Sequence, residues 1–395
     1  MEILKILGRK NELFTNDIYQ NSAFLNEEVQ KSSFLVIGGA GSIGKAITVE
    51  LFKRNPKRLH IVDISENNLV ELVRLIRSSL GYISGDFQTF ALDCGSREFS
   101  ALLNSEGPYD YFFNLSALKH VRSEKDPFTL MRMINVNIFN TKATIEQAIN
   151  QNAKKYFSVS TDKATNPVNM MGASKKIMEL FMSNLSEQIP ISTARFANVA
   201  FSDGSLLYGF IQRIQAKQPI SAPTDVKRYF ITPRESGELC ILSALLAKNN
   251  ELFFPKLSKE LTSTSFDKIA IRYLDYLGFE PVVFDSEEAA RNNSGKLIHE
   301  KKWPCYFFKS DTTGEKDLEE FYTRDEKIEL ERFENIGVVN NNLNCKNKIL
   351  DDFITNIEML KDQGSWSKAD LVKIFMGILP NFTHVELGKS LDEKM

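Results

Sequence analysis

Three chemically active residues follow one another where a short apolar run ends. Residues 156–159 are apolar and typical of a buried strand, and Thr161, Asp162 and Lys163 come shortly after them. A hydroxyl, a carboxylate and an amine at a strand end can hold a bound molecule and move its protons. The same residues could instead form a polar turn that only caps a sheet, so the choice depends on the elements around them.

A glycine-rich segment precedes this stretch in the chain. The apolar run 34–37 leads into Gly38, Gly41 and Gly44, and the helix-like residues 46–52 follow. Glycines in such a turn permit a tight bend, close approach of a pyrophosphate, and close packing of helix on strand. The helix N-terminus also attracts phosphate. A glycine turn without a ligand is the alternative, but the surrounding pattern favours a dinucleotide site.

The next strand indicates which dinucleotide binds. Residues 58–62 are of strand type and end in Asp63, 19 residues after Gly44. A carboxylate there can accept hydrogen bonds from the adenosine ribose hydroxyls and would repel a 2′-phosphate. The sequence therefore favours NAD over NADP.

Strand-type and helix-type segments alternate through the first half of the chain. The expected strands are residues 34–37, 58–62, 87–92, 109–115, 156–159 and 191–196, with helices between them. This alternation predicts an α/β fold, a Rossmann-like doubly wound parallel sheet with helices on both faces. Ligands of such sheets bind beyond the carboxyl ends of the strands, where the glycine turn and the catalytic candidates both lie.

Four regions are expected along the chain. They are an N-terminal helical extension, an NAD-binding Rossmann domain, a smaller substrate-binding region interleaved with it, and a C-terminal helical extension. Their predicted bounds are residues 1–31, 32–196, 197–335 and 336–395. The polar residues 284–302 are expected to be exposed loops or helix ends.

Composition excludes several classes of protein. Of 395 residues, 43% are hydrophobic and 25% charged, and the net charge of −2 offers nucleic acid or an anionic membrane no attraction. The four cysteines are scattered without a CxxC pair, so we expect neither a metal site nor a disulfide framework. No apolar run approaches the ~20 residues that a membrane span needs. Charges interrupt the first residues before a signal peptide could form, so a cytoplasmic location is expected.

Several motifs taken together resemble one family. Besides the glycine turn they are NLSALKHV (114–121), STDKATNP (160–167), MGASK (171–175), RFANV (195–199), RYFIT (228–232) and GEK (314–316). They resemble the extended short-chain dehydrogenases of polysaccharide biosynthesis, and within them the soluble UDP-N-acetylglucosamine 4,6-dehydratases. The resemblance covers roughly residues 33–325, and the ending GKSLDEKM is similar to members from nonulosonic acid pathways.

The resemblance implies a dehydration in which NAD is not consumed. C4 of the sugar loses a hydride to bound NAD+, the resulting ketone acidifies the C5 proton, water leaves from C6, and the hydride returns there. Thr161 would hold O4, Asp162 would protonate O6, and Lys163 would remove the C5 proton. Lys163 must then be partly neutral and Asp162 protonated at its step. Adjacent residues of an extended strand point to opposite sides, so the chain must twist here for both to reach one sugar.

One position departs from the wider superfamily. The usual Tyr-x-x-x-Lys motif has Met171 in place of its tyrosine, and methionine cannot transfer a proton. Lys175 still fits its usual role of binding the nicotinamide ribose. The same replacement occurs in some dehydratases of this family, so it implies that the O4 proton leaves through another group, with Asp162, through Thr161 or a water, as first candidate.

Ligand contacts are assigned from the pattern and the resemblance together. The cofactor residues are Gly38, Gly41, Ser42, Ile43, Gly44, Asp63, Asp93, the backbone at Cys94, Ala117 and Lys175. The residues expected to contact a UDP-sugar, with a GDP-sugar left open, are Lys119, His120, Asn198, Ser205, Arg228 and Glu315. Arg228 would pair with the diphosphate. Plain alternatives are a loop cap for Asn198 and Ser205 and a surface ion pair for Arg228.

Two further expectations concern partners and competing functions. The segments 131–148 and 175–187 are apolar enough to pair with a second subunit, so a homodimer or higher homo-oligomer is expected. The competing functions are a nucleotide-sugar 4-epimerase or reductase on the same scaffold, and an NAD-binding regulator without catalysis. Met171 is the best argument for the regulator, and the intact residues 161–163 argue against it.

Overall fold

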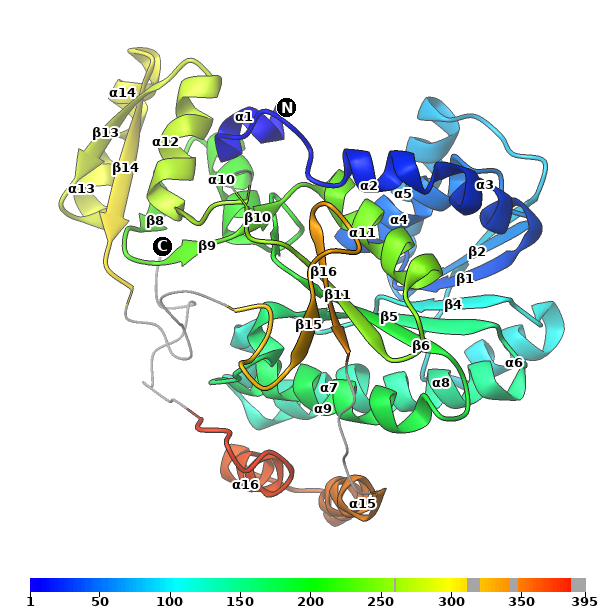
Figure 1. Ribbon diagram of the computed structural model, residues 1–395. Helices are drawn as coiled ribbons and strands as arrows, with labels where there is room; N and C mark the ends of the chain where they lie inside the picture. The colour runs from blue at the N-terminus through cyan, green and yellow to red at the C-terminus, as the bar shows by residue number, and fades with distance from the viewer. Residues whose placement is uncertain (259–260, 311–319, 341–346, 385–395) are drawn as a thin grey trace.

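The computed structural model describes residues 1–258, 261–310, 320–340 and 347–384. Within these ranges a nine-stranded sheet forms the centre of the protein, in the order β15-β16-β11-β6-β5-β4-β1-β2-β3 (Figure 1). In that order its strands are Lys327–Glu329, Ile336–Asn340, Glu251–Pro255, Ile191–Phe196, Lys155–Thr161, Tyr111–Asn114, Ser33–Ile37, Arg58–Asp63 and Asp86–Ala91. The strands from β11 to β3 are parallel, whereas β16 and β15 are added antiparallel. The predicted doubly wound parallel sheet is confirmed.

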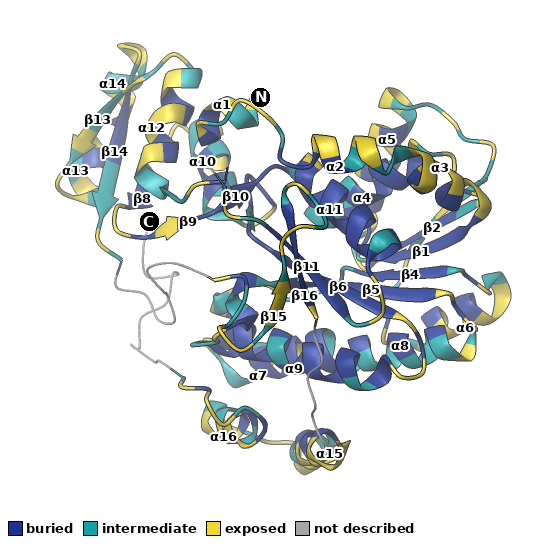
Figure 2. Ribbon diagram, in the orientation of Figure 1, coloured by how far each residue is buried: buried dark blue, intermediate teal, exposed yellow. Residues whose placement is uncertain are grey.

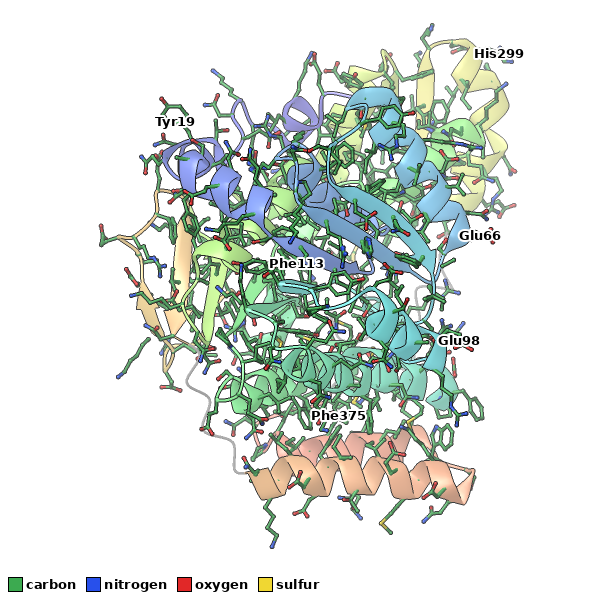
Figure 3. The ribbon with its side chains drawn as sticks, turned by 90° about the vertical axis from the view of Figure 1, so that its right-hand side faces the viewer. Tyr19, Glu66, Glu98, Phe113, His299 and Phe375 are labelled. Atoms are coloured by element: carbon green, nitrogen blue, oxygen red, sulfur yellow. The ribbon has the colours of Figure 1, made fainter. Side chains whose placement is uncertain are left out.

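Helices cover both faces of this sheet, which explains why its inner strands are buried along their length rather than at alternating residues, whereas the edge strands β3 and β15 are only partly buried. On one face lie α4 (Ser42–Phe52), α5 (Glu66–Ser79) and α11 (Pro233–Leu246). On the other lie α6 (Arg97–Glu106), α7 (Pro127–Ile134), α8 (Asn140–Asn150) and α9 (Met170–Leu185). Figure 2 shows the central strands of the sheet and the inner helix faces buried, and the edge strand β15 mostly exposed. Figure 3 places Phe113 of β4 within the sheet layer.

The N-terminal residues are helical, as predicted, in α1 (Ile3–Leu7), α2 (Thr15–Gln20) and α3 (Ser22–Lys31). Arg9 connects them to α11 because its guanidinium pairs with the Glu235 carboxylate, and both side chains are buried. The backbone N–H of Leu13 donates to the same carboxylate at 2.6 Å. The N-terminal extension is therefore packed on the main domain through a buried ion pair.

A second, smaller α/β unit is built from the chain after β6. Its parallel sheet has the order β13-β14-β8, formed by Glu280–Phe284, Lys302–Phe308 and Ile220–Pro223. Its helices are α10 (Leu206–Gln215), α12 (Phe266–Tyr276), α13 (Glu287–Asn292) and α14 (Ser294–His299). Residues 284–302 are mostly exposed, as their polarity predicts, but they contain two helices rather than loops, because Ala290 and Ser294 give them a buried face.

The predicted boundary at residue 336 is wrong. Ile336–Asn340 forms β16, which pairs with β11 inside the main sheet because its apolar residues are buried there. The C-terminal helices begin later, as α15 (Asn347–Gln363) and α16 (Lys368–Ile378), and lie beneath α7 and α9 (Figure 1).

These C-terminal helices cover the surface that sequence analysis assigned to a second subunit. Phe353 and Phe375 belong to one buried apolar cluster with Met131 of α7 and Phe181 of α9. Figure 3 shows Phe375 between the C-terminal helices and the layer above them. Subunit pairing through α7 and α9 would therefore require displacement of α15 and α16. In the described part of the chain, no helix is long and apolar enough to cross a membrane.

Candidate active site

The three catalytic candidates form one hydrogen-bonded group at the end of β5. The strand ends at Thr161, and a 3-10 turn, η3, begins at Asp162. Thr161 Oγ1 donates to Asp162 Oδ1 at 2.8 Å, and Lys163 Nζ lies 3.0 Å from the same oxygen. The 3-10 turn supplies the local twist that lets two successive side chains meet.

Asp162 has one carboxylate oxygen without a partner. The residue is 1% exposed, and its Oδ2 is buried with no hydrogen bond among the described residues. A buried polar oxygen without a partner costs free energy, and such atoms are rare unless water or a ligand satisfies them. Asp162 therefore has an acceptor position available while its other oxygen is held by Thr161 and Lys163.

The glycine turn fits a bound pyrophosphate. Gly38 has a φ of +73°, a conformation that side chains disfavour, and a Cβ there would lie 2.7 Å from the backbone nitrogen of Ser116. A Cβ on Gly44 would lie 2.1 Å from the carbonyl oxygen of Gly38, so only glycine permits this close packing. A Cβ on Gly41 would meet nothing nearer than 3.5 Å. Ser42 begins α4, so its helix N-terminus is at the turn.

Asp63 supports the glycine turn directly. Its Oδ2 accepts from the N–H of Ala40 at 3.0 Å, and its Oδ1 accepts from the N–H of Ser65 at 2.9 Å. A carboxylate has about four acceptor positions, so each oxygen can still accept from a ribose hydroxyl. Asp63 thus holds the loop as well as offering the predicted ribose contact. Ile43, in the first turn of α4, packs partly against the core.

Residues after β3 and β4 lie at the same edge of the sheet. Asp93 Oδ1 accepts from the N–H of Gly95 at 2.8 Å. The Cys94 thiol is buried 3.8 Å from the Ser116 hydroxyl, and burial raises its pKa, so only the backbone of Cys94 is suited to an adenine. Ala117, the residue after Ser116, is half-buried.

Helix α9 holds Met171 and Lys175. Met171 is buried in the apolar cluster beneath the sheet. Lys175 Nζ donates to the carbonyl of Val159 at 3.1 Å, and burial lowers the pKa of this lysine to about 8, opposed by the charge of Glu179. The Val159 bond ties Lys175 to β5, two residues before Thr161.

Asn137, which is not among the predicted site residues, joins two parts of the candidate site. Its Oδ1 accepts from the N–H of Leu118 at 2.9 Å, and its Nδ2 donates to the Leu118 carbonyl at 3.0 Å and to Ser174 Oγ at 2.9 Å. The residue lies in a π-helical turn, η2 (Asn135–Phe139), between α7 and α8. Such turns often occur at functional sites. The sequence feature that could have revealed Asn137 is an apolar, helix-like segment that is interrupted by asparagines.

The predicted substrate residues divide into two groups. Lys119 Nζ lies 3.5 Å from the Ser202 hydroxyl, and the His120 ring lies against Gly204. The neighbouring Asp203 contacts the glycine turn, because Ser42 Oγ donates to its carboxylate at 2.8 Å and accepts from its N–H at 2.9 Å. The segment that includes residues 202–204 therefore lies beside both the glycine turn and residues 119–120.

The other substrate candidates have structural contacts of their own. Asn198 pairs with the Tyr229 carbonyl in a short parallel pair, β7 (Asn198–Val199) with β10 (Phe230–Ile231). Ser205 caps α10 by accepting from the N–H of Tyr208 at 3.1 Å. Arg228 lies on β9 (Lys227–Arg228), which pairs with β12 (Thr264–Ser265). Its side chain is buried, which excludes the alternative of an ion pair on the protein surface. Glu315 and the GEK motif lie outside the described residues.

Gly41→Ala tests the glycine turn without disturbing the fold. Gly41 has φ −72° and ψ 174°, which alanine tolerates, and its new methyl group would be in ordinary contact with the protein. Only a pyrophosphate on the backbone would meet it, so we expect the Kd for NAD to rise about 10-fold or more with an unchanged Tm. Gly209→Ala, whose methyl meets nothing within 4 Å, is the control. Unchanged NAD affinity in Gly41→Ala would contradict this placement.

Comparison with known proteins identifies relatives over most of the chain. The family described as Polysaccharide biosynthesis protein matches residues 34–341. A Methanocaldococcus jannaschii protein described as an uncharacterized membrane protein, MJ1061, is 32% identical over 279 residues, covering 68% of this chain and 79% of that protein. A Campylobacter jejuni UDP-N-acetylglucosamine 4,6-dehydratase (inverting) is 28% identical over 237 residues, covering 58% of this chain and 67% of the enzyme. UDP-glucose 4-epimerases are also among the relatives. The chain spans less than half the length of two further relatives.

Solved structures share the fold. The X-ray structure of Pen from Bacillus thuringiensis aligns with a TM-score of 0.65 at 22% identity, covering 84% of this chain and 99% of that one. The family match extends from β1 to the end of β16 and includes the glycine turn, the η3 turn with the catalytic candidates, and the first turns of α9. The chain therefore belongs to the polysaccharide biosynthesis protein family, within the extended short-chain dehydrogenases.

Proposed function

We propose that the protein is an NAD-dependent 4,6-dehydratase of a nucleotide-activated N-acetylhexosamine. The expected substrate is UDP-N-acetylglucosamine and the product UDP-2-acetamido-2,6-dideoxy-4-hexulose, for bacterial surface glycan or nonulosonic acid biosynthesis. The observation that carries the proposal is the buried Asp162 carboxylate, held by Thr161 and Lys163 on one oxygen and unpartnered on the other. The named activity of the Campylobacter relative supports it.

The residues present suit bound NAD. The glycine turn would take the pyrophosphate, Asp63 the adenosine ribose, and Lys175 the nicotinamide ribose. NAD, when bound, supplies the acceptor and later the donor of one hydride. The buried amine of Lys175 has a pKa of about 8, and its bond to the Val159 carbonyl fixes its distance from the catalytic turn.

Proton movements balance within the chain's own residues. The O4 proton passes to Asp162, directly or through Thr161, whose hydroxyl donates to Asp162 Oδ1. Asp162 then gives that proton to O6, which leaves as water. Lys163 takes the C5 proton and later returns a proton to C5. Asp162 ends ionised and Lys163 neutral, as they began, so Met171 is required for no proton transfer.

Mass spectrometry and NMR of the product in D2O test this function. Incubation with UDP-N-acetylglucosamine should remove one water, and deuterium should enter at C5 because the protons on Lys163 exchange with solvent. The coupling constants would also give the configuration at C5. Unchanged mass with a new stereoisomer would indicate an epimerase, and unchanged substrate with bound NAD would indicate a regulator; either result overturns the proposal.

A 4-epimerase is the second candidate. It is favoured by the UDP-glucose 4-epimerases among the relatives. Epimerases of this superfamily typically use the tyrosine of Tyr-x-x-x-Lys to remove the O4 proton, and this chain has a buried methionine there. They also have no use for an acid directed at O6. The contact between Asp162 and Lys163 therefore favours dehydration.

A further inference from the structure

Two hydrogen bonds to the buried carboxylate of Glu124 connect the C-terminal segment to the start of α9. Glu124 ends the 3-10 turn η1 (Val121–Glu124) and is 3% exposed. Its Oε2 accepts from the N–H of Met170, the first residue of α9, at 2.9 Å. The Nε2 of His384 lies 3.1 Å from the same oxygen. An ionised carboxylate only accepts, so Nε2 is the donor in this contact.

The turn held by this link supports the catalytic turn. Gly172 packs so closely that a Cβ on it would lie 2.4 Å from the carbonyl oxygen of Lys163. Asn169 caps the same turn by accepting from the N–H of Gly172 at 2.8 Å. Lys175 follows one turn later. A shift at the start of α9 would therefore be transmitted to Lys163, whereas Lys175 is held separately by its bond to the Val159 carbonyl.

His384 is brought to this position by a packed element. It follows α16, whose Phe375 is fully buried against α7 and α9. The indole of Trp366, between α15 and α16, donates to the carbonyl of Pro127 at 2.9 Å. The C-terminal helices are therefore held against α7 and α9 by apolar packing and by the Trp366 hydrogen bond. The contact between His384 and Glu124 adds one further polar bond at the start of α9.

Glu124 depends on this bond. Its other oxygen, Oε1, is buried and has no hydrogen-bond partner among the described residues. Without His384, the N–H of Met170 would be the one hydrogen-bond donor left to the Glu124 carboxylate in the part of the chain that the structure describes. A buried charge with a single neutral donor is unfavourable. The carboxylate would turn toward water and release the first turn of α9.

We propose that His384 is a positioning residue, which acts through Glu124 to hold the first turn of α9 against the catalytic turn. The C-terminal helices thereby become part of the catalytic apparatus rather than an independent extension. The activity readout rests on the proposed function, whereas the local order of residues 162–173 does not.

The test compares His384→Ala with His384→Gln, since the glutamine amide can replace Nε2 as donor. We expect His384→Ala to lower kcat about 10-fold to 100-fold, while the KM and the Kd for NAD stay within about twofold. Hydrogen exchange of residues 169–173 should become faster. His384→Gln should restore most of both. Met376→Ala, on the exposed side of α16, serves as the unchanged control.

Two results would overturn the proposal. In the first, the His384→Ala variant shows the same hydrogen exchange of residues 169–173 and the same kcat as the wild type. In the other, both variants lose Tm and kcat in parallel, which indicates only a structural contact. If the wild type does not convert UDP-N-acetylglucosamine, the proposed function fails, and the exchange of residues 169–173 alone decides the role of His384.

Discussion

Asp162→Asn should abolish dehydration while NAD remains bound. Asparagine keeps the volume of the side chain and an oxygen that can accept from Thr161, so the turn should persist. It cannot carry a proton from O4 to O6, and the loss of that step should lower kcat by about 10³-fold. The measurement is product formation by mass spectrometry, with bound NAD quantified from the denatured protein.

A matched control isolates this effect. Asp285→Asn makes the same chemical change at an exposed residue after β13, and should leave kcat and Tm unchanged. Near-normal turnover of Asp162→Asn would exclude Asp162 as the acid. Loss of NAD in the same variant would show instead that the carboxylate is needed to shape the site.

The parallel half of the sheet was predictable because its signal is local. The strands from β1 to β6 alternate with helices along the chain, and the six expected strands overlap them, whereas the parallel strand β11 was missed. The antiparallel edge was missed because β15 is only three residues long and β16 pairs with β11, a strand distant in the chain. In the small unit, β13 and β14 contain Pro281 and Pro304, which interrupt a strand pattern.

The candidate site can be proposed from adjacent residues of the sequence, but the contacts that support it cannot. Thr161, Asp162 and Lys163 are adjacent in sequence, so a single turn brings them together. Asn137, Asp203 and Glu124 act through contacts with residues 19 to 260 positions away, and no local pattern marks such pairs. Each is a polar residue whose partner is chosen by tertiary packing.

A buried ion network behind the catalytic strand is another such support. Arg195 of β6 is fully buried and donates to Glu179 at 2.7 and 3.0 Å and to Glu326 at 2.7 and 2.8 Å. It also donates to the carbonyl of Phe321 at 2.9 Å. Ser160, next to Thr161, donates to Glu179 at 2.6 Å. The network joins β5, β6, α9 and the segment before β15.

Arg195→Met should lower the free energy of unfolding by about 3–5 kcal/mol, because the two buried carboxylates would lose their hydrogen-bonded cation. Lys176 would remain, at 3.4 Å from Glu179 and 3.8 Å from Glu326. Urea denaturation at pH 7 measures it. Arg291→Met, which removes an exposed arginine 4.0 Å from Glu287, should cost less than about 1 kcal/mol. A loss in Arg195→Met no larger than this control would contradict the assigned role of the network.

The dependence on pH distinguishes this cause from simple loss of packing. In the wild type burial would raise the pKa of Glu179, but Arg195, helped by Lys176 and Ser160, outweighs burial and lowers this pKa to about 2. The stabilisation by Glu179 is therefore complete above the unfolded value of 4.5 and declines below it. Without Arg195, burial is opposed less, by Lys176 and Ser160, so the pKa of Glu179 should rise and the variant should gain less stability than the wild type as the pH rises from about 4 to 7. The difference between the two proteins should therefore be largest near pH 7 and shrink toward pH 4. A packing defect alone would leave that difference constant across the range.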